Sequence, residues 1–540
     1  MTCGSVRCRL TAFLSLLALA GRGQSPAVFA PPSPADSSNI IRIIKADRLT
    51  MVKVDSVSER YVLAGHVQLR QGNTVFHCDS AVKDERTNLV EAFGNIHIND
   101  GDTIHTYAQY LRYPGDTRVA TLKRKVRLTD GKGVLTTEEL QYDVNTGVGT
   151  YDKGGKVVNG STVLTSREGQ YFSDTREVVF RRNVVLKDPE YDMTTDTLLY
   201  SIDREVATFV SPTDIHDGRT RIRTRSGYYD LNTGSAQFGS RPVIQDSTQQ
   251  VIADDIRYDK RKGSGTAEGN VLYRDTAQGV TILAGLTEFN NETKEVTASR
   301  KPVMILRQDD DSVYVSADTL KSLAVRDTSA SARTPDKAAT GMATTASEPG
   351  KDTVRTLLAY HRVRIFSDSL QGVCDSLSYS TSDSVFRFFR DPILWARESQ
   401  LSGDTILLYT KNRKPDRILV LEKGFSVNKT PESLFNQLRG NTLNGIFRDG
   451  SIDYLRAKGN AESLYYLQDD DSSYFGLNYA KADAISMYFR DKELKRVSWV
   501  NGVEGTTYPI RQIPDEKRRL RDFQWQEAKR PKTRYELFLD

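Results

Sequence analysis

The sequence lacks any long hydrophobic run and has only four cysteines among its 540 residues. No stretch of about 18 or more apolar residues occurs, so no transmembrane helix is expected. Two of the cysteines, Cys78 and Cys374, lie far apart, each directly before an aspartate. We expect both to be small buried residues and not redox groups or metal ligands. A hydrophobic content of 38% with 27% charged residues indicates a folded, well-solvated protein.

An excess of one sign of charge is also missing. The chain has 75 Lys and Arg residues against 70 Asp and Glu residues, a formal net charge of +5. Proteins that bind nucleic acid carry a basic face that neutralises phosphates. The sequence therefore predicts no nucleic-acid partner.

Motifs that carry known chemistry are absent as well. There is no Gly-rich phosphate loop, no serine nucleophile elbow and no His-Glu-x-x-His motif. The six histidines show no metal-ligand spacing. The sequence therefore predicts no enzyme, no catalytic residue, no metal site and no cofactor.

What the sequence does contain is a repeat of about 29 residues that runs along nearly its whole length. Its clearest part is an acid, a spacer, an aliphatic residue, a spacer and a tyrosine, as in Glu138–Tyr142, Asp196–Tyr200, Asp254–Tyr258 and Asp375–Tyr379. Self-similarity at a fixed period is typical of stacked arrays, in which each unit buries its apolar face against its neighbours. The function is therefore expected on an extended surface or groove.

Each copy reads as short strands joined by polar turns. Runs such as Gly65–Leu69, Gly94–Asp100 and Gly269–Asp275 alternate between apolar and polar residues. Period-two alternation with turn residues every 8–12 positions indicates β-strands, and helical periodicity is missing. The predicted fold class is all-β, an elongated stacked array.

The acids of the repeat, including Glu138, Asp196, Asp254, Asp318, Asp375 and Asp483, recur at one repeat position. A catalytic pair would be unique to one or two copies. Recurrence favours a structural task, such as capping a turn or bonding to nearby backbone N–H groups.

The ends and the breaks in the repeat define the domain organisation. Arg7 and Arg9 precede a short apolar run that ends at Ala20, so residues 1–20 are predicted to be a secretory signal peptide. Repeats occupy 38–326 and 353–510, and the Ala-, Ser- and Thr-rich segment 327–352 is predicted to be a flexible linker or loop. The Thr430-Pro431-Glu432 sequence predicts a short helical insertion over 430–440. For the charged tail, 511–540, a docking helix and a solvated segment are equally compatible with the sequence.

A stripe of aliphatic and aromatic residues follows the repeats. If the two sheets splay into a V, this stripe lines a hydrophobic groove, and if they close, it forms an ordinary core. The residues proposed to line the groove are Val67, Leu69, Val90, Phe93, Ile96, Ile98, Val126, Leu128, Val184, Leu186, Val271, Tyr273, Val303 and Ile305.

The repeats resemble the OstA-like proteins of lipopolysaccharide transport, whose relatives include the periplasmic bridge protein LptA and the N-terminal domain of LptD. The resemblance rests on the segments Asn183–Phe209 and Val251–Asp275, and on Phe435–Gly440 with Gly459–Tyr466 near the C-terminus. It implies an elongated, open, V-shaped β-jellyroll of two stacked antiparallel sheets, whose interior holds the acyl chains of lipid A. It also implies sheet-edge pairing with other transport components and a place in the periplasm or at the periplasmic face of the outer membrane, peripheral to the membrane.

Two functions follow from these observations. The first is a lipopolysaccharide-transport and outer-membrane-assembly protein that carries acyl chains in its groove. The alternative is a structural or adhesive β-solenoid with a closed core and no lipid cargo.

Overall fold

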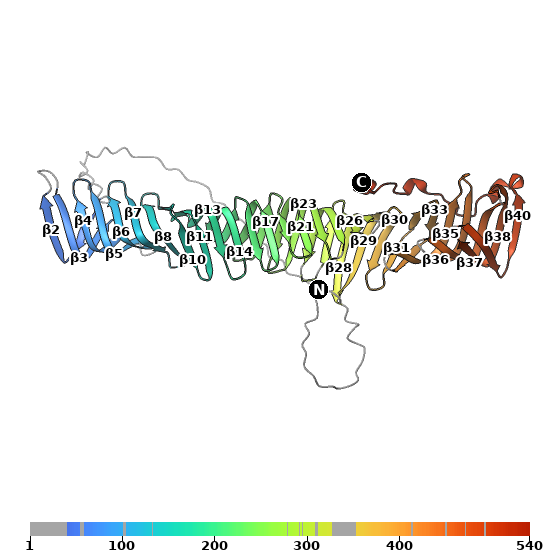
Figure 1. Ribbon diagram of the computed structural model, residues 1–540, viewed down its shortest axis with the longest axis horizontal. Coiled ribbons are helices and arrows are strands. Elements are labelled where there is room, and N and C mark those ends of the chain that lie inside the picture. The colour runs from blue at the N-terminus through green and yellow to red at the C-terminus, as the bar shows by residue number, and fades with distance from the viewer. Residues whose placement is uncertain are drawn as a thin grey trace, which may run out of the picture.

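The computed structural model describes residues 40–53, 59–100, 104–131, 133–277, 279–290, 292–293, 295–307, 312–326, 353–411, 414–448, 451–469, 471–490 and 493–539. These residues form a long, narrow stack of strands. The strands lie across the long axis, from β2 at one end to β40 at the other (Figure 1). The predicted signal peptide, 1–20, and the predicted linker, 327–352, lie outside the described residues.

Hydrogen bonding joins forty strands of the described chain into one antiparallel sheet. The N-terminal strands are β1 (Arg42–Lys45), β2 (Arg48–Lys53), β3 (Glu59–Gln71), β4 (Thr74–Asp84), β5 (Leu89–Asp100), β6 (Ile104–Pro114), β7 (Val119–Thr129), β8 (Gly133–Asp143), β9 (Val148–Tyr151), β10 (Gly155–Asn159), β11 (Thr162–Ser166), β12 (Glu168–Phe172) and β13 (Glu177–Lys187). The middle strands are β14 (Asp192–Ser201), β15 (Val206–Phe209), β16 (Thr213–Asp217), β17 (Thr220–Thr224), β18 (Ser226–Asp230), β19 (Ser235–Gly239), β20 (Val243–Gln245), β21 (Gln249–Ile252), β22 (Asp255–Asp259), β23 (Ser264–Asp275), β24 (Val280–Asn290), β25 (Glu295–Ser299), β26 (Val303–Arg307), β27 (Ser312–Ser316) and β28 (Thr319–Arg326).

The C-terminal strands are β29 (Thr353–Phe366), β30 (Gln371–Ser380), β31 (Val385–Phe389), β32 (Ile393–Ala396), β33 (Ser399–Ser402), β34 (Thr405–Lys411), β35 (Lys414–Lys429), β36 (Phe435–Arg448), β37 (Ser451–Gln468), β38 (Tyr474–Arg490), β39 (Glu493–Val500) and β40 (Glu504–Pro509). Four short 3₁₀ turns follow in the tail, η3 (Ile510–Gln512), η4 (Asp515–Lys517), η5 (Glu527–Lys529) and η6 (Arg534–Phe538). The prediction of an all-β, elongated fold is confirmed.

The single sheet is folded lengthwise into two layers, because each long strand gives one half to each layer. In β14, Asp192–Thr195 pair with β16, whereas Leu198–Ser201 pair with β15. We call the layer that runs from β1 to β40 layer 1, and the layer that runs from β2 to β39 layer 2. One repeat adds two strands to each layer, so it lengthens the array by about 10 Å.

The two layers meet along one side, which we call the corner. Register shifts at the corner coincide with pairs of residues at positive φ, such as Gly65 (78°) with His66 (44°) and Gly269 (77°) with Asn270 (44°). Left-handed backbone of this kind bends a strand sharply and is easiest for Gly and Asn. Pairs of left-handed residues such as these therefore help to turn the long strands that carry them from one layer into the other.

The far side, opposite the corner, consists of the hairpin turns that end each layer. The backbone hydrogen bonds found there join turns of the same layer, as between Val144 and Arg118 (3.0 Å) in layer 2 and between Thr276 and Thr248 (2.9 Å) in layer 1. Within the described residues, no strand pairing crosses from one layer to the other on this side. The far side is therefore the side on which the layers can separate.

The ladder continues past the segment that divides the two predicted arrays. β28 pairs with β29 from Thr319↔Tyr360 to Arg326↔Thr353. One apolar cluster also runs from Ala253 to Met487. The strands on either side of 327–352 thus belong to the same two layers.

The predicted helix over 430–440 is wrong. Residues 431–433 form a turn, and β36 begins at Phe435. The Thr430 N–H donates to the Leu434 carbonyl (2.9 Å), and Thr430 Oγ1 accepts from the Leu434 N–H (3.1 Å), which closes a hairpin between β35 and β36. Thr and Pro suit a tight turn as well as a helix start, and the pairing of Lys429 with Phe435 decides between them.

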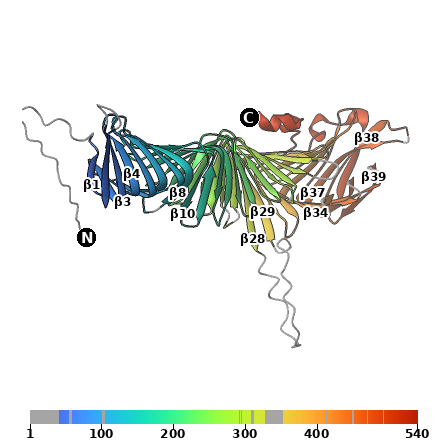
Figure 2. The same ribbon diagram turned by 60° about the vertical axis from the view of Figure 1, so that its left-hand side comes forward.

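The tail after β40 docks on the outer face of layer 1 and forms no α-helix. It returns toward the middle of the array, where the C-terminus lies (Figures 1 and 2). Leu520 and Leu537 are buried, and Phe523 and Trp525 pack around Phe435. Of the two readings of this segment, docking is the one that the structure shows.

Candidate lipid-binding interior

A continuous row of apolar side chains lines the inner face of layer 1. Cross-strand neighbours follow one another along it as Ile43, Leu69, Phe76, Ile98, Thr106, Leu128, Leu135, Val157, Leu164, Leu186, Met193, Ile215, Ile222, Ile244, Val251, Tyr273, Ile282, Met304, Val315 and Ile365. Thr106 is the only polar member of this stretch. Paired side chains on one face of a sheet contact one another, so the row is a single apolar strip across more than half of the array.

Most of the predicted groove residues point into the space between the layers. Val67, Leu69, Val90, Ile96, Ile98, Val126, Leu128, Val184, Leu186, Val271 and Tyr273 all belong to buried apolar clusters. Val90 lies in layer 2, and the other ten lie in layer 1. The structure brings these eleven residues together along one interior.

Phe93 points the other way. Its side chain is 41% exposed and packs against Tyr110 on the outer face of layer 2. Ala92, the residue before it, is the buried one. Phe93 directly precedes the bend at Gly94 and Asn95. Because the chain changes direction there, the sequence does not reveal which of the residues before the bend face inward.

Val303 and Ile305 also lie on the outer face of layer 1, although Val303 is itself buried there. Met304 and Leu306 of the same strand pack in the interior cluster, and alternate residues of a strand point to opposite faces. Val303 pairs with Leu283 and Ser316, and Ile305 pairs with Thr281 and Tyr314, all on the outer face. The run Val303–Leu306 is apolar throughout, so its alternation cannot be read from the sequence.

Several interior residues were not among the groove residues predicted from the sequence. Phe180, Met193, Leu198, Phe209, Ile215, Phe238, Ile256, Ile282, Met304 and Ile365 are all buried between the layers. The aliphatic residue of the acid-x-aliphatic-x-Tyr motif, such as Leu198 and Ile256, is the inward residue of layer 2. The motif itself was therefore the missed signal.

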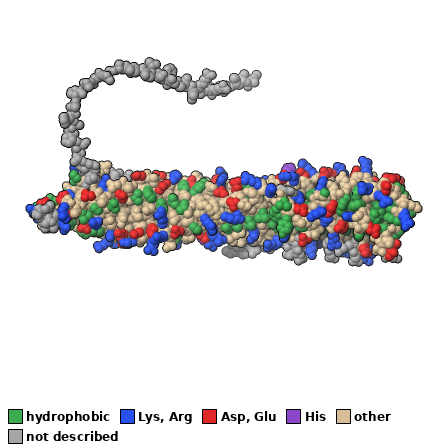
Figure 3. Space-filling model, turned by 90° about the horizontal axis from the view of Figure 1, so that it is seen from above, with side chains coloured by type: hydrophobic (Ala, Val, Ile, Leu, Met, Phe, Trp, Pro, Cys, Tyr) green, Lys and Arg blue, Asp and Glu red, His purple; other side chains and the backbone are tan. Residues whose placement is uncertain are grey.

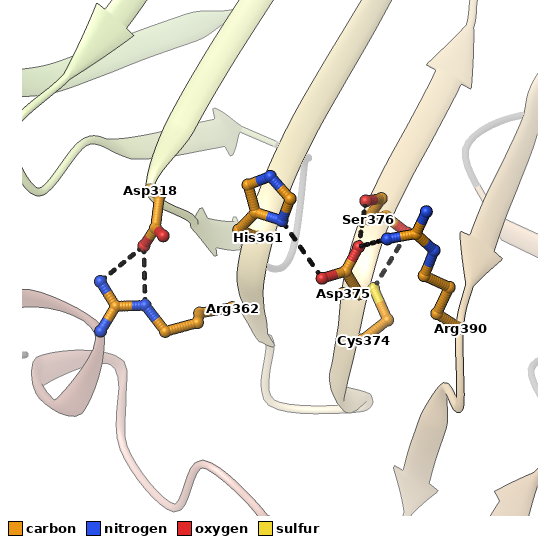
Figure 4. Close-up of polar contacts among 7 residues, drawn as sticks. All are labelled: Asp318, His361, Arg362, Cys374, Asp375, Ser376 and Arg390. Carbon is orange, nitrogen blue, oxygen red and sulfur yellow. Dashed lines mark hydrogen bonds and ion pairs between the residues drawn. The ribbon is translucent and has the colours of Figure 1, made fainter.

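Several of the recurring acids contact side chains of neighbouring strands at the corner. Asp79 Oδ2 accepts from Asn95 Nδ2 (2.9 Å), and Asp254 Oδ2 accepts from Asn270 Nδ2 (2.7 Å). In Figure 4, Asp318 pairs with Arg362 (2.7 Å), and Asp375 contacts His361 (3.2 Å) and Arg390 (3.3 Å). Hydrogen bonds from Ser376 and His361, with the charge of Arg390 nearby, hold the pKa of the Asp375 carboxyl below its usual range. The partners are side chains and not the expected backbone N–H groups, but the task is structural.

Polar side chains connect the two layers across the far side. The Tyr113 hydroxyl in layer 2 donates to Gln71 Oε1 in layer 1. Arg176, in a turn of layer 2, pairs with Asp130 of layer 1 at 3.1 Å. Lys260 of layer 2 pairs with Glu190 of layer 1 at 2.5 Å, and Arg355 of layer 2 pairs with Asp275 of layer 1 at 3.5 Å. We call the last three the cross-layer ion pairs.

The interior contains a cavity beside the first cross-layer ion pair. It has a volume of about 80 Å³ and lies between layer 1 residues such as Leu128 and Val157 and layer 2 residues such as Tyr171 and Phe180. Asp130 lines its edge. The wall is otherwise almost entirely apolar, so its chemistry suits hydrocarbon.

A second hollow, of about 980 Å³, lies along β13, β14, β16 and β17. Its lining combines charged residues such as Asp214 and Arg223 with apolar residues such as Val184, Val243 and Ile252. Arg221 forms an ion pair with Asp214 close by and lowers the pKa of that carboxyl. The hollow thus offers both apolar and charged side chains.

Two further observations concern the part of the chain that the structure describes. It contains no group of three or more His, Cys, Asp or Glu residues placed to hold a metal ion. It also has no helix that is both long and apolar enough to cross a membrane.

Together, these layers and the apolar strip between them define a long two-layered β-structure with a hydrophobic interior. Comparison with protein families adds a name to part of it: residues 38–196 match the family described as OstA-like protein. The resemblance predicted from the repeats is confirmed over this segment, which extends from before β1 to the middle of β14. The chain matches no curated protein.

Proposed function

We propose that this protein is a periplasmic carrier in lipopolysaccharide transport and outer-membrane assembly, which holds lipid A acyl chains between its two layers. The continuous inner row from Ile43 to Ile365 is the observation that carries the proposal. The OstA-like match over residues 38–196 supports the substrate class. We infer binding and not catalysis, because the recurring acids are engaged at the corner.

The physical basis of binding is burial of hydrocarbon. Each methylene moved from water to an apolar surface contributes about 0.8 kcal/mol. Chains lie between the layers when the far side opens, since no strand pairing crosses it in the described residues. Successive rungs of the row are nearly equivalent, so a chain can shift along the interior without a deep energy minimum.

Sheet-edge pairing would connect the carrier to other transport components. β2 is the terminal strand of layer 2, and its inward residues Leu49 and Met51 are each 54% exposed. An unpaired strand edge beside exposed apolar residues is a template for another sheet. We propose that a partner sheet adds to this end and extends the interior.

A photo-crosslinking amino acid placed at Leu69, Ile98 or Leu186 tests the carrier function. All three side chains are buried in the interior, whereas Leu199 points outward and serves as the matched control. We expect lipopolysaccharide adducts at the three interior positions and none at Leu199. Equal labelling at all four positions, or no adduct at any, contradicts the proposal.

The alternative, a structural or adhesive β-solenoid with a closed core, draws support from the packed interior. Leu63 and Leu198 are fully buried, and side chains bridge the far side. The alternative predicts that no lipid co-purifies with the mature protein. Mass spectrometry of co-purifying lipids separates the two functions.

A further inference from the structure

The cross-layer ion pairs differ from the other ion pairs near the hairpin turns. Arg204 with Glu177 (3.0 Å) and Arg60 with Asp84 (3.0 Å) join strands within layer 2. Arg176, Lys260 and Arg355 also reach from layer 2 to carboxylates of layer 1. Arg176 keeps a second partner within layer 2, Asp203, at 2.7 Å. The same division of charge holds in all three pairs, with the cation on layer 2 and the anion on layer 1.

Two of the cross-layer ion pairs lie at the edge of the apolar interior, whereas the third, Lys260–Glu190, is more exposed. Arg355 lies beside Tyr273, which is a member of the inner row, and Asp130 borders the interior cavity. The carboxylates of Asp130 and Asp275 are only 9% and 3% exposed. A lipid with its acyl chains between the layers would therefore place its head group beside these cations.

Separation of the layers breaks the ion pairs. In the Arg176–Asp130 and Arg355–Asp275 pairs, where the carboxylate is buried, loss of one partner leaves an unpaired charge, which is costly, so the cation needs a substitute anion. A phosphate group carries more charge than a carboxylate and accepts paired hydrogen bonds from a guanidinium. A phosphate-bearing amphiphile supplies that substitute as its chains enter.

We propose that Arg176, Lys260 and Arg355 form a binding site for the anionic head group of an acylated phospho-ligand, which displaces Asp130, Glu190 and Asp275. This inference rests on the proposed carrier function. In the unloaded protein the carboxylates occupy the cations and hold the far side closed. The ligand both fills the interior and replaces the carboxylates, so neutral amphiphiles open the layers less readily.

The test compares two amphiphiles with the same chain, dodecyl phosphate and dodecyl maltoside, by calorimetric titration of the full chain below their micelle concentrations. We expect the wild type to prefer the phosphate by about tenfold, the value of one or more charge-assisted hydrogen bonds. In the variant R176Q/K260Q/R355Q the preference should fall to about one. In D130N/E190Q/D275N it should increase, because the cations lose the competing carboxylates of layer 1, and Asp203 alone remains beside Arg176. Inorganic phosphate alone should bind too weakly to detect, since it has no chain to bury.

The control is Glu177→Gln, which removes an ion pair within one layer and should leave the preference unchanged. Thermal unfolding verifies that each variant folds, and the exposed pair Lys260–Glu190 provides single variants if the triple ones unfold.

A preference that survives R176Q/K260Q/R355Q overturns the head-group site. Equal wild-type binding of both amphiphiles overturns the site but leaves the carrier function standing, whereas no binding of either contradicts both. Binding of inorganic phosphate as tight as that of dodecyl phosphate shows an anion site independent of lipid and also overturns the proposal.

Discussion

The side-chain oxygen of Gln437 accepts a hydrogen bond of 2.8 Å from the backbone N–H of Leu520, in the C-terminal tail. Its side-chain nitrogen donates to the Arg518 carbonyl at 3.0 Å. Gln400 makes the same pair of bonds to Gln526 (2.8 Å) and Gln524 (2.7 Å). Each amide thus binds the tail as a neighbouring strand would.

We expect Gln400→Ala to release the tail locally. The substitution leaves two backbone groups of the tail without their partner, at a cost of about 1–3 kcal/mol for a buried polar group. Hydrogen exchange at Gln526 and limited proteolysis of residues 514–539 measure the release. Gln250 of β21 lies on the outer face of layer 1, away from the tail. Gln250→Ala should therefore leave both measurements unchanged. Identical protection of the tail in the two variants would show that the glutamine contacts do not hold it.

Gly94→Ala should destabilise the protein more than Gly72→Ala. Both glycines have positive φ, 74° and 56°, so both substitutions carry a backbone cost of about 1 kcal/mol. Only at Gly94 would the new methyl group overlap the Asp79 carboxylate, because nothing lies within 4 Å at Gly72. Urea denaturation measures the difference. Adding Asp79→Ala to Gly94→Ala should recover part of the loss, and no recovery would argue against the overlap as its cause.

Leu198 and Leu199 offer a test of which face of layer 2 is the inner one. Leu198 is 0% exposed and Leu199 is 36% exposed, although they are neighbours in β14. Leu198→Ala should lower the free energy of unfolding by about 2–5 kcal/mol, the usual cost of truncating a buried leucine. Leu199→Ala should change it by less than about 1 kcal/mol. Comparable losses in chemical denaturation would mean that the assigned register is wrong.

Cys78 and Cys374 should resist thiol reagents in the folded protein. Burial raises the pKa of each thiol from 9.0 to about 12, with nearby aspartates adding to the shift. At pH 8 the thiolate fraction is then about one in ten thousand. Because the folded pKa is above the unfolded value, the stability contributed by these protonated thiols is fully present below pH 9 and is lost as the pH rises through 12. Reaction with dithionitrobenzoate across this range, in a Cys3→Ser/Cys8→Ser background, checks both statements, and fast labelling at pH 8 would refute them.

The alternation of apolar residues was enough to predict the fold class and most of the interior. In Val67–Leu69 and Val184–Leu186 the inward residues are separated by one outward residue, and a period of two needs no knowledge of distant contacts. Val303–Leu306 is apolar at every position, so only its pairing with β24 and β27 reveals which residues face inward. The prediction that Phe93 faces the interior was wrong for a different reason, because the bend beside this residue interrupts the alternation along the strand.

Contacts between distant segments were beyond the reach of local patterns. Thr430-Pro431-Glu432 fits a helix start and a hairpin equally, and the partner strand decides. The cross-layer ion pairs join residues of different repeats, such as Arg176 and Asp130, and nothing in either residue's neighbourhood indicates the other. Charge of both signs is spread along the surface, as Figure 3 shows for one face, so composition does not single out these pairs.

The docked tail changes how the C-terminal half of the array can come apart. In a stack whose rungs contact only their neighbours, one weak rung is enough to divide it. The tail contacts Gln437, Gln400, Gln371, Arg364 and Tyr314, on five different strands from β36 back to β27. Splitting the ladder anywhere beneath it also requires peeling the tail away. Residues 511–539 therefore couple these five strands, so that the strands beneath the tail separate cooperatively and not one at a time.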